Sequence, residues 1–388
     1  MKIIRDPLWK NISISDDLFE ATHTRAFLRI QKIKQLGPTF LTYPGATHTR
    51  ASHSFGVYHV AMKLLESLCK KGAASFVTES GKKAFLAAAL FHDIGHFPYT
   101  HSLKELSLEE HETLSAKAVI SPELAKVLAD YGADASQVAA IIDHNLKADS
   151  ETGFYRKLLS GVLDPDKLDY LNRDAFFCGV PYGIQDTDRI LESTLPDKEK
   201  GIKINSDDML NVENILFSKY MMYKAVYWHK NVRIATALMK KALHAAITKK
   251  ILLPEELYQL DDFSVFTLLH SRSNFTEFKC ALAVEENKLY KTILEVPFDE
   301  NNALHVKLEN LDFRSEYENE LAQKLKLEKC DLLIDVPERI SFESSLLLPG
   351  FTVFSSETIQ DFTKNLRKIR VAVKAEASDI LIEKSIFL

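Results

Sequence analysis

Cysteine is scarce in this chain, which has four among its 388 residues. The four, Cys69, Cys178, Cys280 and Cys330, lie far apart and form no CxxC pair. A zinc ribbon needs paired cysteines and a disulfide framework needs a dense set of them, so neither is expected. We predict free thiols in a reducing compartment, and therefore a cytoplasmic protein.

The chain also lacks a long apolar run and a strong excess of charge. The segment MKIIRDPLWKNISI has charges and a proline where a secretory signal has an apolar stretch, and no later run is long enough to cross a bilayer. With a formal net charge of -5, the chain has no overall attraction to nucleic acid or to anionic lipid. We expect no membrane partner and no nucleic-acid partner, and we expect any phosphate binding to be local.

Over residues 15–255 the apolar residues recur at helical spacing. This spacing is clear in AMKLLESLCK, KKAFLAAALFHD, PELAKVLADY and ATALMKKALHAAITKK. After Pro254 the runs FKCALAV, KTILEVPF, CDLLIDV, ISFES and FTVFS are typical of strands, and the charged stretch SEYENELAQKLKLE is typical of a helix. We predict a mainly α-helical domain over 1–255 and a smaller, closely packed α+β lobe over 256–388.

Histidine is concentrated in one part of the chain, because eight of the thirteen lie between residues 48 and 144. The sharpest signal there is LAAALFHDIGHFPYTH, in which an apolar helix ends at His92 and Asp93. His96 and His101 follow at once, and His53 lies on an earlier predicted helix. Neutral imidazole and carboxylate groups suit the middle range of divalent metals. This region is therefore a candidate metal site.

A second segment, GVLDPDKLDYLNRDAFFCG, predicts a helix with functional groups on one face. Asp164 is predicted as the N-cap and Pro165 as the first helical residue. Residues four positions apart on a helix lie on the same face. That face, with its flank, carries a carboxylate, a cation, a phenol and a second carboxylate: Asp166, Lys167, Tyr170 and Asp174. Such a face can hold a metal, a phosphate and a hydroxyl in order.

The polar residues of this region divide into a metal set and a structural set. Two histidines and two carboxylates at helix ends otherwise bring several desolvated charges together, so we predict that these four bind a metal: His53, His92, Asp93 and Asp166. Three others are interpreted as a helix cap and a surface ion pair: Asp164, Asp169 and Arg173. Five imidazoles are expected to be hydrogen-bonded or exposed: His59, His144, His244, His270 and His305.

Seven segments between residues 2 and 235 occur in an order that resembles one known family. They are IIRDP, IKQLG, YPGATHTRASHSFGV, HDIGHFPYTH, HETLS, LDPDKLDYLNRDAFFCGV and YWHK. A histidine, a His-Asp pair and a distant aspartate resemble the pattern of the HD superfamily of phosphohydrolases. The full series is similar to the branch that contains the vertebrate SAM-and-HD-domain deoxynucleotide triphosphohydrolase. The carboxy-terminal lobe resembles that branch only loosely.

The resemblance implies an HD-type helical bundle that uses a divalent metal to attack the α-phosphorus of a dNTP, releasing deoxynucleoside and triphosphate. It implies that the metal set given above binds the ion. The residues that it places beside the attacked bond are His96, His101 and His111. The residues that match contacts to phosphate or sugar are Gln35, Arg50, Lys167, Tyr170, Asp174, Lys219 and Tyr227. Because relatives commonly self-associate, a homo-oligomer, dimer or tetramer, is expected.

The chain departs from the pattern of the vertebrate enzyme at several positions, among them Lys104, Lys219 and Trp228, the last of which replaces a glutamine. Lys104 stands where that enzyme has an aspartate that orients the catalytic histidine, which leaves His101, His111 and Glu112 as alternatives for the proton donor. Lys219 replaces an arginine that contacts phosphate, which keeps the charge but loses the bidentate fork. The polar nucleotide-activator set of the vertebrate enzyme is missing from the amino-terminal segment, so activation by guanine nucleotide is not expected.

Two other functions stay open from the sequence. The same metal site suits a nucleoside monophosphate phosphatase or a phosphodiesterase, although the cations Arg50, Lys167, Lys219 and Lys230 favour more than one phosphate. Outside the enzymes, the alternative is a nucleotide-binding regulatory module with negligible turnover. Mixed ligation by two imidazoles and two carboxylates admits Fe, Mn, Zn, Ni or Mg.

Overall fold

The computed structural model describes residues 1–204, 208–340, 361, 364 and 366–379. Its amino-terminal part is built mainly of helices, as the apolar spacing predicts. The helices are α1 (Asp16–Glu20), α2 (Arg25–Ile30), α3 (Arg50–Lys70), α4 (Glu79–Phe91), α5 (His111–Val119), α6 (Pro122–Tyr131), α7 (Ala135–Ile142), α8 (Ser150–Leu159), α9 (Pro165–Cys178), α10 (Thr187–Ser193), α11 (Met209–Met222) and α12 (Lys230–Thr248). Shorter helical turns join them: η1 (Ala21–His23), η2 (Gly37–Leu41), η3 (Ala73–Ser75), η4 (Thr100–Leu106) and η6 (Tyr223–Tyr227).

Two small antiparallel hairpins accompany these helices. Strand β1 (Lys2–Asp6) pairs with β2 (Lys10–Ile14), and β3 (Thr194–Asp197) pairs with β4 (Gly201–Ile204). The domain is therefore mainly helical, as predicted, with β3 and β4 as a short hairpin that the apolar spacing does not indicate. Each of these two strands has four residues, a length at which apolar spacing does not separate a strand from a helical turn.

The carboxy-terminal lobe combines short helices with an antiparallel sheet in the order β5-β7-β6, which confirms the predicted α+β lobe. Its strands are β5 (Lys291–Pro297), β6 (Leu332–Asp335) and β7 (Lys368–Val373). Its helices are α13 (Pro254–Leu257), α14 (Ser264–Ser271), α15 (Phe278–Glu285), α16 (Ala303–Lys307) and α17 (Leu311–Lys324), with the turns η7 (Lys329–Asp331) and η8 (Ala375–Ala377). The runs KTILEVPF and CDLLIDV form strands, and the charged stretch forms α17.

One predicted strand of this lobe is wrong. The run FKCALAV forms all of α15 except its last residue, because Phe278, Ala281 and Val284 recur at helical spacing and are all buried. Helix α15 packs on α12. The run FTVFS lies outside the described residues, and of ISFES only Ile340 lies within them.

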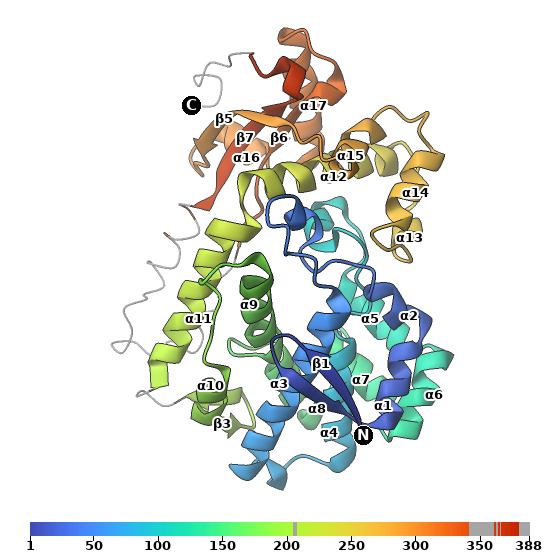
Figure 1. The fold of residues 1–388 in the computed structure, drawn as a ribbon, viewed down its shortest axis with the longest axis vertical. Coiled ribbons are helices and arrows are strands. Elements are labelled where there is room, and N and C mark those ends of the chain that lie inside the picture. Colours follow the sequence, from blue (N-terminus) through green and yellow to red (C-terminus); the bar gives the residue numbers. More distant parts are fainter. Residues whose placement is uncertain (205–207, 341–360, 362–363, 365, 380–388) are drawn as a thin grey trace.

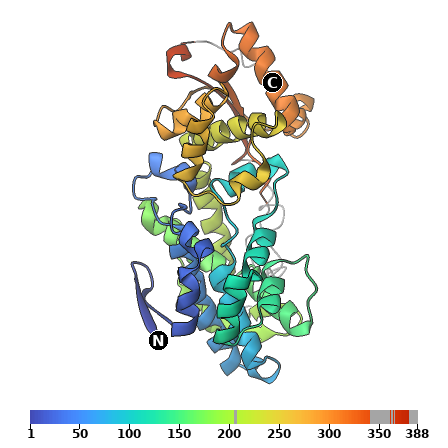
Figure 2. The same cartoon turned by 90° about the vertical axis from the view of Figure 1, so that its right-hand side faces the viewer.

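The packing of the long helices positions the candidate site. Helix α3 packs against both α4 and α9, and these three helices share one core that extends from Ile12 to Val226. A second core joins Phe97 and Leu103 of the helical body to α12 and to the lobe. Figures 1 and 2 show the lobe at one end of the molecule, far from the amino terminus, with α12 running into it. Helix α12 therefore packs both on the helical body and on the carboxy-terminal lobe. The domain boundary at residue 255 stays a prediction.

Within the described residues, every helix is too short or too polar to span a bilayer.

Candidate metal centre and active site

Three helix ends meet at the predicted metal set. His53 lies in the first turn of α3, which begins with a capping box at Thr49. His92 is the C-cap of α4, and Asp93 follows it directly. Asp166 lies in the first turn of α9, where Asp164 is the N-cap as predicted. The helix boundaries read from the sequence therefore place these groups on rigid elements.

The four predicted ligands lie close together in space. His53 Nε2 is 2.9 Å from Asp166 Oδ1, and His92 Nε2 is 3.7 Å from the same oxygen. Asp93 Oδ1 is 3.3 Å from His92 Nε2, and Asp93 Oδ2 is 3.9 Å from His53 Nε2. We call His53, His92, Asp93 and Asp166 the metal cluster.

The hydrogen bonds around the two imidazoles suit a metal. Nδ1 of His53 lies 2.8 Å from an Asp169 carboxylate oxygen, and Nδ1 of His92 lies 3.0 Å from the Ala89 carbonyl. Both Nε2 atoms are buried and face the carboxylates of Asp93 and Asp166 at ion-pair distance, without a well-directed hydrogen bond to them. An imidazole that donates from one nitrogen to an oxygen presents the other nitrogen as a metal ligand. The two inward nitrogens and the carboxylates thus form a donor set for a divalent cation.

The charges of the metal cluster also favour a cation. Burial lowers the pKa of His53, but the adjacent carboxylates of Asp166 and Asp169 raise it to about 10. Burial raises the pKa of Asp166, but His53 and His92 hold it well below its usual value. The site therefore draws positive charge to its centre, and a divalent metal would supply it.

Asp169 and Arg173 form the predicted ion pair, but the prediction that they lie on the surface is wrong. Both side chains are fully buried, and Arg173 Nε lies 2.8 Å from Asp169 Oδ2. Asp169 also accepts from the Trp9 indole N–H at 2.5 Å and holds the His53 ring. A Cβ added to Gly56 on α3 would stand 1.9 Å from Asp169 Oδ1. Gly56, three residues after His53, is thus the feature of the sequence that could have indicated that α9 packs closely on this face of α3.

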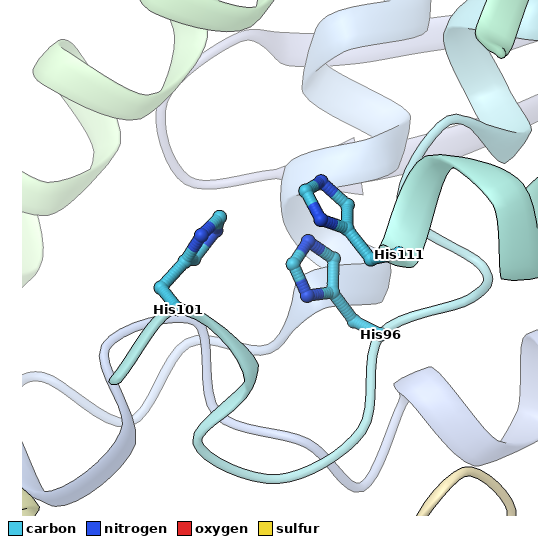
Figure 3. Close-up of side chains that lie close together, drawn as sticks. All are labelled: His96, His101 and His111. Carbon is cyan, nitrogen blue, oxygen red and sulfur yellow. The ribbon is translucent and has the colours of Figure 1, made fainter. Parts of the chain in front are cut away.

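A second group of imidazoles lies beside the metal cluster. We call His96, His101 and His111 the imidazole cluster, and Figure 3 shows their rings facing one another. Their nitrogens lie within 4.8 Å of one another. The rings of His96 and His111, however, are stacked, with centroids 3.9 Å apart and an interplanar angle of 25°. A metal binds in the plane of an imidazole ring, so one ion cannot serve both of these stacked rings in this arrangement.

The imidazole cluster is held neutral. Burial, together with the charge of Arg50, holds the pKa of His96 well below the usual value. The pKa of His101 is lowered too, by the surrounding protein and by Arg50, although the His101 side chain is exposed to solvent. Burial, aided by Arg50 and Lys104, lowers the pKa of His111 to about 4. Glu112, the other proton-donor candidate, has a carboxylate oxygen 3.1 Å from His111 Nδ1, and burial raises its pKa.

Two cavities meet at the metal cluster. The larger, of about 540 Å³, is lined by Asp166, His101 and all seven residues predicted to contact phosphate or sugar: Gln35, Arg50, Lys167, Tyr170, Asp174, Lys219 and Tyr227. The smaller, of about 470 Å³, is lined by His92, Asp93, His111 and Glu112, among others. Asp166, Lys167 and His101 line both cavities. The structure therefore gathers the predicted substrate residues on the wall of a single cavity.

His48, which the sequence did not single out, lies behind the wall of the larger cavity and holds Asp174, one of the residues that line it. Its Nε2 lies 2.8 Å from Asp174 Oδ1, and its ring stacks on Phe177 with centroids 4.6 Å apart. Tyr227 donates its hydroxyl to Asp174 Oδ2 at 2.7 Å. Both carboxylate oxygens of Asp174 are thus held in a fixed orientation. The sequence could not indicate this contact, because His48 and Asp174 lie far apart in the chain and no local pattern connects them.

Four of the five imidazoles that were expected to be hydrogen-bonded or exposed meet that expectation, but His59 does not, because it is buried and its Nδ1 has no hydrogen-bond partner among the described residues. His244 lies 3.0 Å from Asp312, and His270 lies 2.7 Å from Glu285. His305 Nδ1 accepts from a backbone N–H at 2.9 Å. His59 contacts the Trp9 ring, and His144 Nε2 lies 3.4 Å from the Ser160 hydroxyl.

Comparison with known proteins matches two family models to this chain. The model described as HD domain matches residues 50–174, and the model described as HD associated region matches residues 185–362. The matched HD domain contains the metal cluster and the imidazole cluster. Two solved structures have the same fold: a hypothetical protein from Aquifex aeolicus (TM-score 0.71, 25% identity, 97% of this chain and 99% of that one) and a phosphohydrolase from Bacteroides thetaiotaomicron (TM-score 0.72, 24% identity, 96% and 99%).

The chain is also similar in sequence to several curated proteins. The uncharacterized protein YwfO of Bacillus subtilis is 36% identical over 63% of this chain and 56% of its own length. An uncharacterized protein of Methanocaldococcus jannaschii is 30% identical over 78% of this chain and 62% of its own length. A deoxynucleoside triphosphate triphosphohydrolase SAMHD1 homolog of Dictyostelium discoideum is 26% identical over 76% and 60%. The chain thus spans a little over half the length of these relatives. It belongs to the HD-domain proteins, with an HD domain followed by an HD-associated region.

Proposed function

We propose that this protein is a metal-dependent phosphohydrolase that cleaves dNTPs at the α-phosphorus, giving deoxynucleoside and triphosphate. The observation that carries the proposal is the larger cavity, because Asp166 of the metal cluster and all seven predicted phosphate and sugar residues line it. A phosphohydrolase among the structural neighbours and a dNTP triphosphohydrolase homolog among the sequence relatives support it.

The metal cluster would hold a divalent ion, which lowers the pKa of bound water and withdraws charge from a phosphoryl oxygen. Arg50 Nη1 donates to Asp93 Oδ2 at 2.7 Å, which fixes that carboxylate. Arg50 also lines the larger cavity and is buried with its Nε unpartnered among the described residues, so it has a further donor for phosphate. Arg50 thereby links the metal cluster to the charge that builds on the phosphate during attack.

We assign the proton transfer to His101, the alternative that the geometry favours over His111 and Glu112. His101 lines both cavities, whereas His111 and Glu112 line only the smaller one. The positive charge of Arg50 is among the effects that lower the pKa of His101, which favours the neutral imidazole in the free protein. A bound polyphosphate brings negative charge that opposes this effect, so the imidazole gains a proton when the substrate is present. It then stands where it can protonate the departing oxygen.

The inner wall of the larger cavity suits a deoxyribose. The Asp174 carboxylate, held by His48 and Tyr227, can accept a hydrogen bond from a sugar hydroxyl. Gln35 Oε1 is buried and has no partner among the described residues, which provides a second acceptor. The Tyr227 ring forms part of the same wall. These acceptors favour a nucleoside over a simple phosphate ester.

The number of cations favours a polyphosphate over a nucleoside monophosphate. Lys104, Lys167, Lys219 and Arg339 line the larger cavity together with Arg50. One phosphoryl group needs fewer partners than this, and several cations along a cavity suit a chain of phosphates. For this reason we place the monophosphatase and phosphodiesterase alternatives second.

The test is to load the protein with each of several divalent metals, incubate it with each dNTP and separate the products by ion exchange. Deoxynucleoside with triphosphate is the expected result. Phosphate or deoxynucleoside monophosphate would contradict the proposed bond, and binding without product would support the regulatory module instead. Asp93→Ala should remove both metal and turnover. The matched control is Asp188→Ala, whose side chain is 74% exposed and pairs with Lys63.

A further inference from the structure

The turn that carries His101 is held by a carboxylate that the proposed chemistry does not use. Turn η4 contains His101, Lys104 and Glu105, and it is bounded by two residues with positive φ, Tyr99 at 63° and Ser107 at 52°. The backbone therefore reverses sharply on either side of a short helical turn. Such turns have weaker hydrogen-bond geometry than an α-helix, so tertiary contacts must fix their position.

Both oxygens of Glu105 are bound by cations from other elements. Lys240 Nζ on α12 donates to Glu105 Oε1 at 2.6 Å, and Arg314 Nη2 on α17 donates to Glu105 Oε2 at 2.9 Å. The Lys240 and Arg314 side chains are 4% and 6% exposed. Ion pairs that are screened from water in this way constrain geometry far more than surface pairs do. Glu105 thus clamps η4 between α12 and the carboxy-terminal lobe.

The same clamp reaches the wall of the larger cavity. Lys240 also donates to Glu338 at 2.8 Å, and Glu338 lines that cavity. Glu338 accepts from Arg233 at 3.1 Å, and Arg233 pairs with Asp335 of β6 at 2.6 Å. One lysine therefore connects the His101 turn to a part of the cavity wall that the lobe supplies.

Apolar contacts alone fix only part of the position of η4. Leu103 and Leu106 are buried in the core that η4 shares with α12 and the lobe, and they set the depth of the turn. Glu105 lies between them and is held from two sides. Its two ion pairs oppose rotation of the turn about its own axis, which would swing His101 away from the metal cluster.

We infer that Glu105 is a positioning residue, which holds His101 at the cavity by tying η4 to α12 and the carboxy-terminal lobe. The inference rests on the proposed role of His101 in turnover. It gives the lobe a part in the reaction, because a shift of α17 relative to α12 would move the turn that bears His101. Misplacing a catalytic group by about 1 Å can cost about 100-fold in rate.

The test compares Glu105→Gln with Lys368→Gln in the full chain loaded with metal. Lys368 pairs with Glu295 at the far end of the same ion-pair network, where its side chain is 42% exposed. Glu105→Gln should lower kcat by about 10- to 100-fold with KM little changed. Metal content should be unaltered, and hydrogen exchange should quicken in the peptide covering residues 99–107. Lys368→Gln should match the wild type in every respect.

The outcomes separate this inference from the proposed function. If the wild type cleaves dNTPs and Glu105→Gln keeps its kcat, the inference is overturned while the proposed function stands. If the wild type cleaves no dNTP, the proposed function fails and the catalytic role of Glu105 fails with it, whatever the exchange shows. Should Glu105→Gln not fold, Arg314→Gln removes one of the two clamping contacts. It should give a smaller loss of kcat with the same unchanged KM, and an unchanged kcat would overturn the inference.

Discussion

The metal cluster and the imidazole cluster lie side by side and share a residue type, but their surroundings carry opposite charge. Around the first, carboxylates raise the pKa of His53 to about 10. Around the second, burial with the cations Arg50 and Lys104 lowers the pKa of His111 to about 4. The first group attracts a cation, while the second stays neutral and borders cations that suit phosphate. The charges around the imidazoles, more than the imidazoles themselves, therefore divide the roles.

The largest effects are expected when one residue is removed from the metal cluster or from the imidazole cluster, because the two losses should differ in their effect on bound metal. Asp166→Ala removes the carboxylate that faces both inward Nε2 atoms, so bound metal should fall to background and turnover should be lost with it. His111→Ala leaves the metal cluster intact, so it should keep its metal while turnover falls. Elemental analysis of the purified variants, beside the product assay, checks both. Loss of metal from His111→Ala would show that the two clusters hold one ion jointly.

A smaller effect is expected from the buried carboxylate behind the metal cluster. Asp169→Asn weakens the hydrogen bond that directs His53, and such a change typically costs about 10- to 100-fold in metal affinity. It also leaves Arg173 with less compensation, and breaking a buried ion pair costs about 3–5 kcal/mol of stability. Metal competition against a chelator measures the first effect and thermal unfolding of the metal-free protein measures the second. Asp188→Asn on the exterior is the control, and equal behaviour of the two variants would contradict the assigned role.

The local sequence predicted the site residues that lie at helix ends. The HD pair follows an apolar helix, and the Asp-Pro start fixes where α9 begins, so the spacing alone placed His92, Asp93 and Asp166 at helix termini. These signals lie within a few residues, where capping and apolar spacing are strong. The same spacing failed for α15, whose apolar run is too short to distinguish strand from helix without its partner α12.

Contacts between residues far apart in the sequence could not be predicted from local sequence patterns. The pairs His48–Asp174 and Glu105–Lys240 join residues 126 and 135 positions apart. The i,i+4 spacing identified Asp169 and Arg173 as a pair but said nothing of what covers them. The burial of Asp169 and Arg173 depends on how α3 and α9 pack. The local sequence indicates this close packing through Gly56, where a Cβ would collide with both side chains. The proximity of the four residues of the metal cluster was thus predictable, whereas the groups that orient their side chains were not.

The smallest expected effect comes from removing one positive charge beside the imidazole cluster and measuring how the pH dependence of kcat changes. Lys104 is exposed and lines the larger cavity. It lowers the pKa of His101, after the larger effects of the surrounding protein, Arg50 and His111. Because His101 must carry a proton to act as an acid, activity should fall as pH rises through its pKa in the substrate complex. Lys104→Met removes a nearby positive charge and raises that pKa, so the alkaline limb of the kcat profile should move up by about 0.5–1 pH unit.

The kcat profile of Lys104→Met is best compared with that of Lys63→Met, which removes an exposed charge that pairs with Asp188 on the exterior. Only the first variant should shift the limb, and the shift should shrink at high ionic strength because salt screens an exposed charge. A limb that stays in place or moves down would exclude His101 as the acid. The proton would then come from His111 or Glu112, and the division between the two clusters would have to be drawn around the smaller cavity instead.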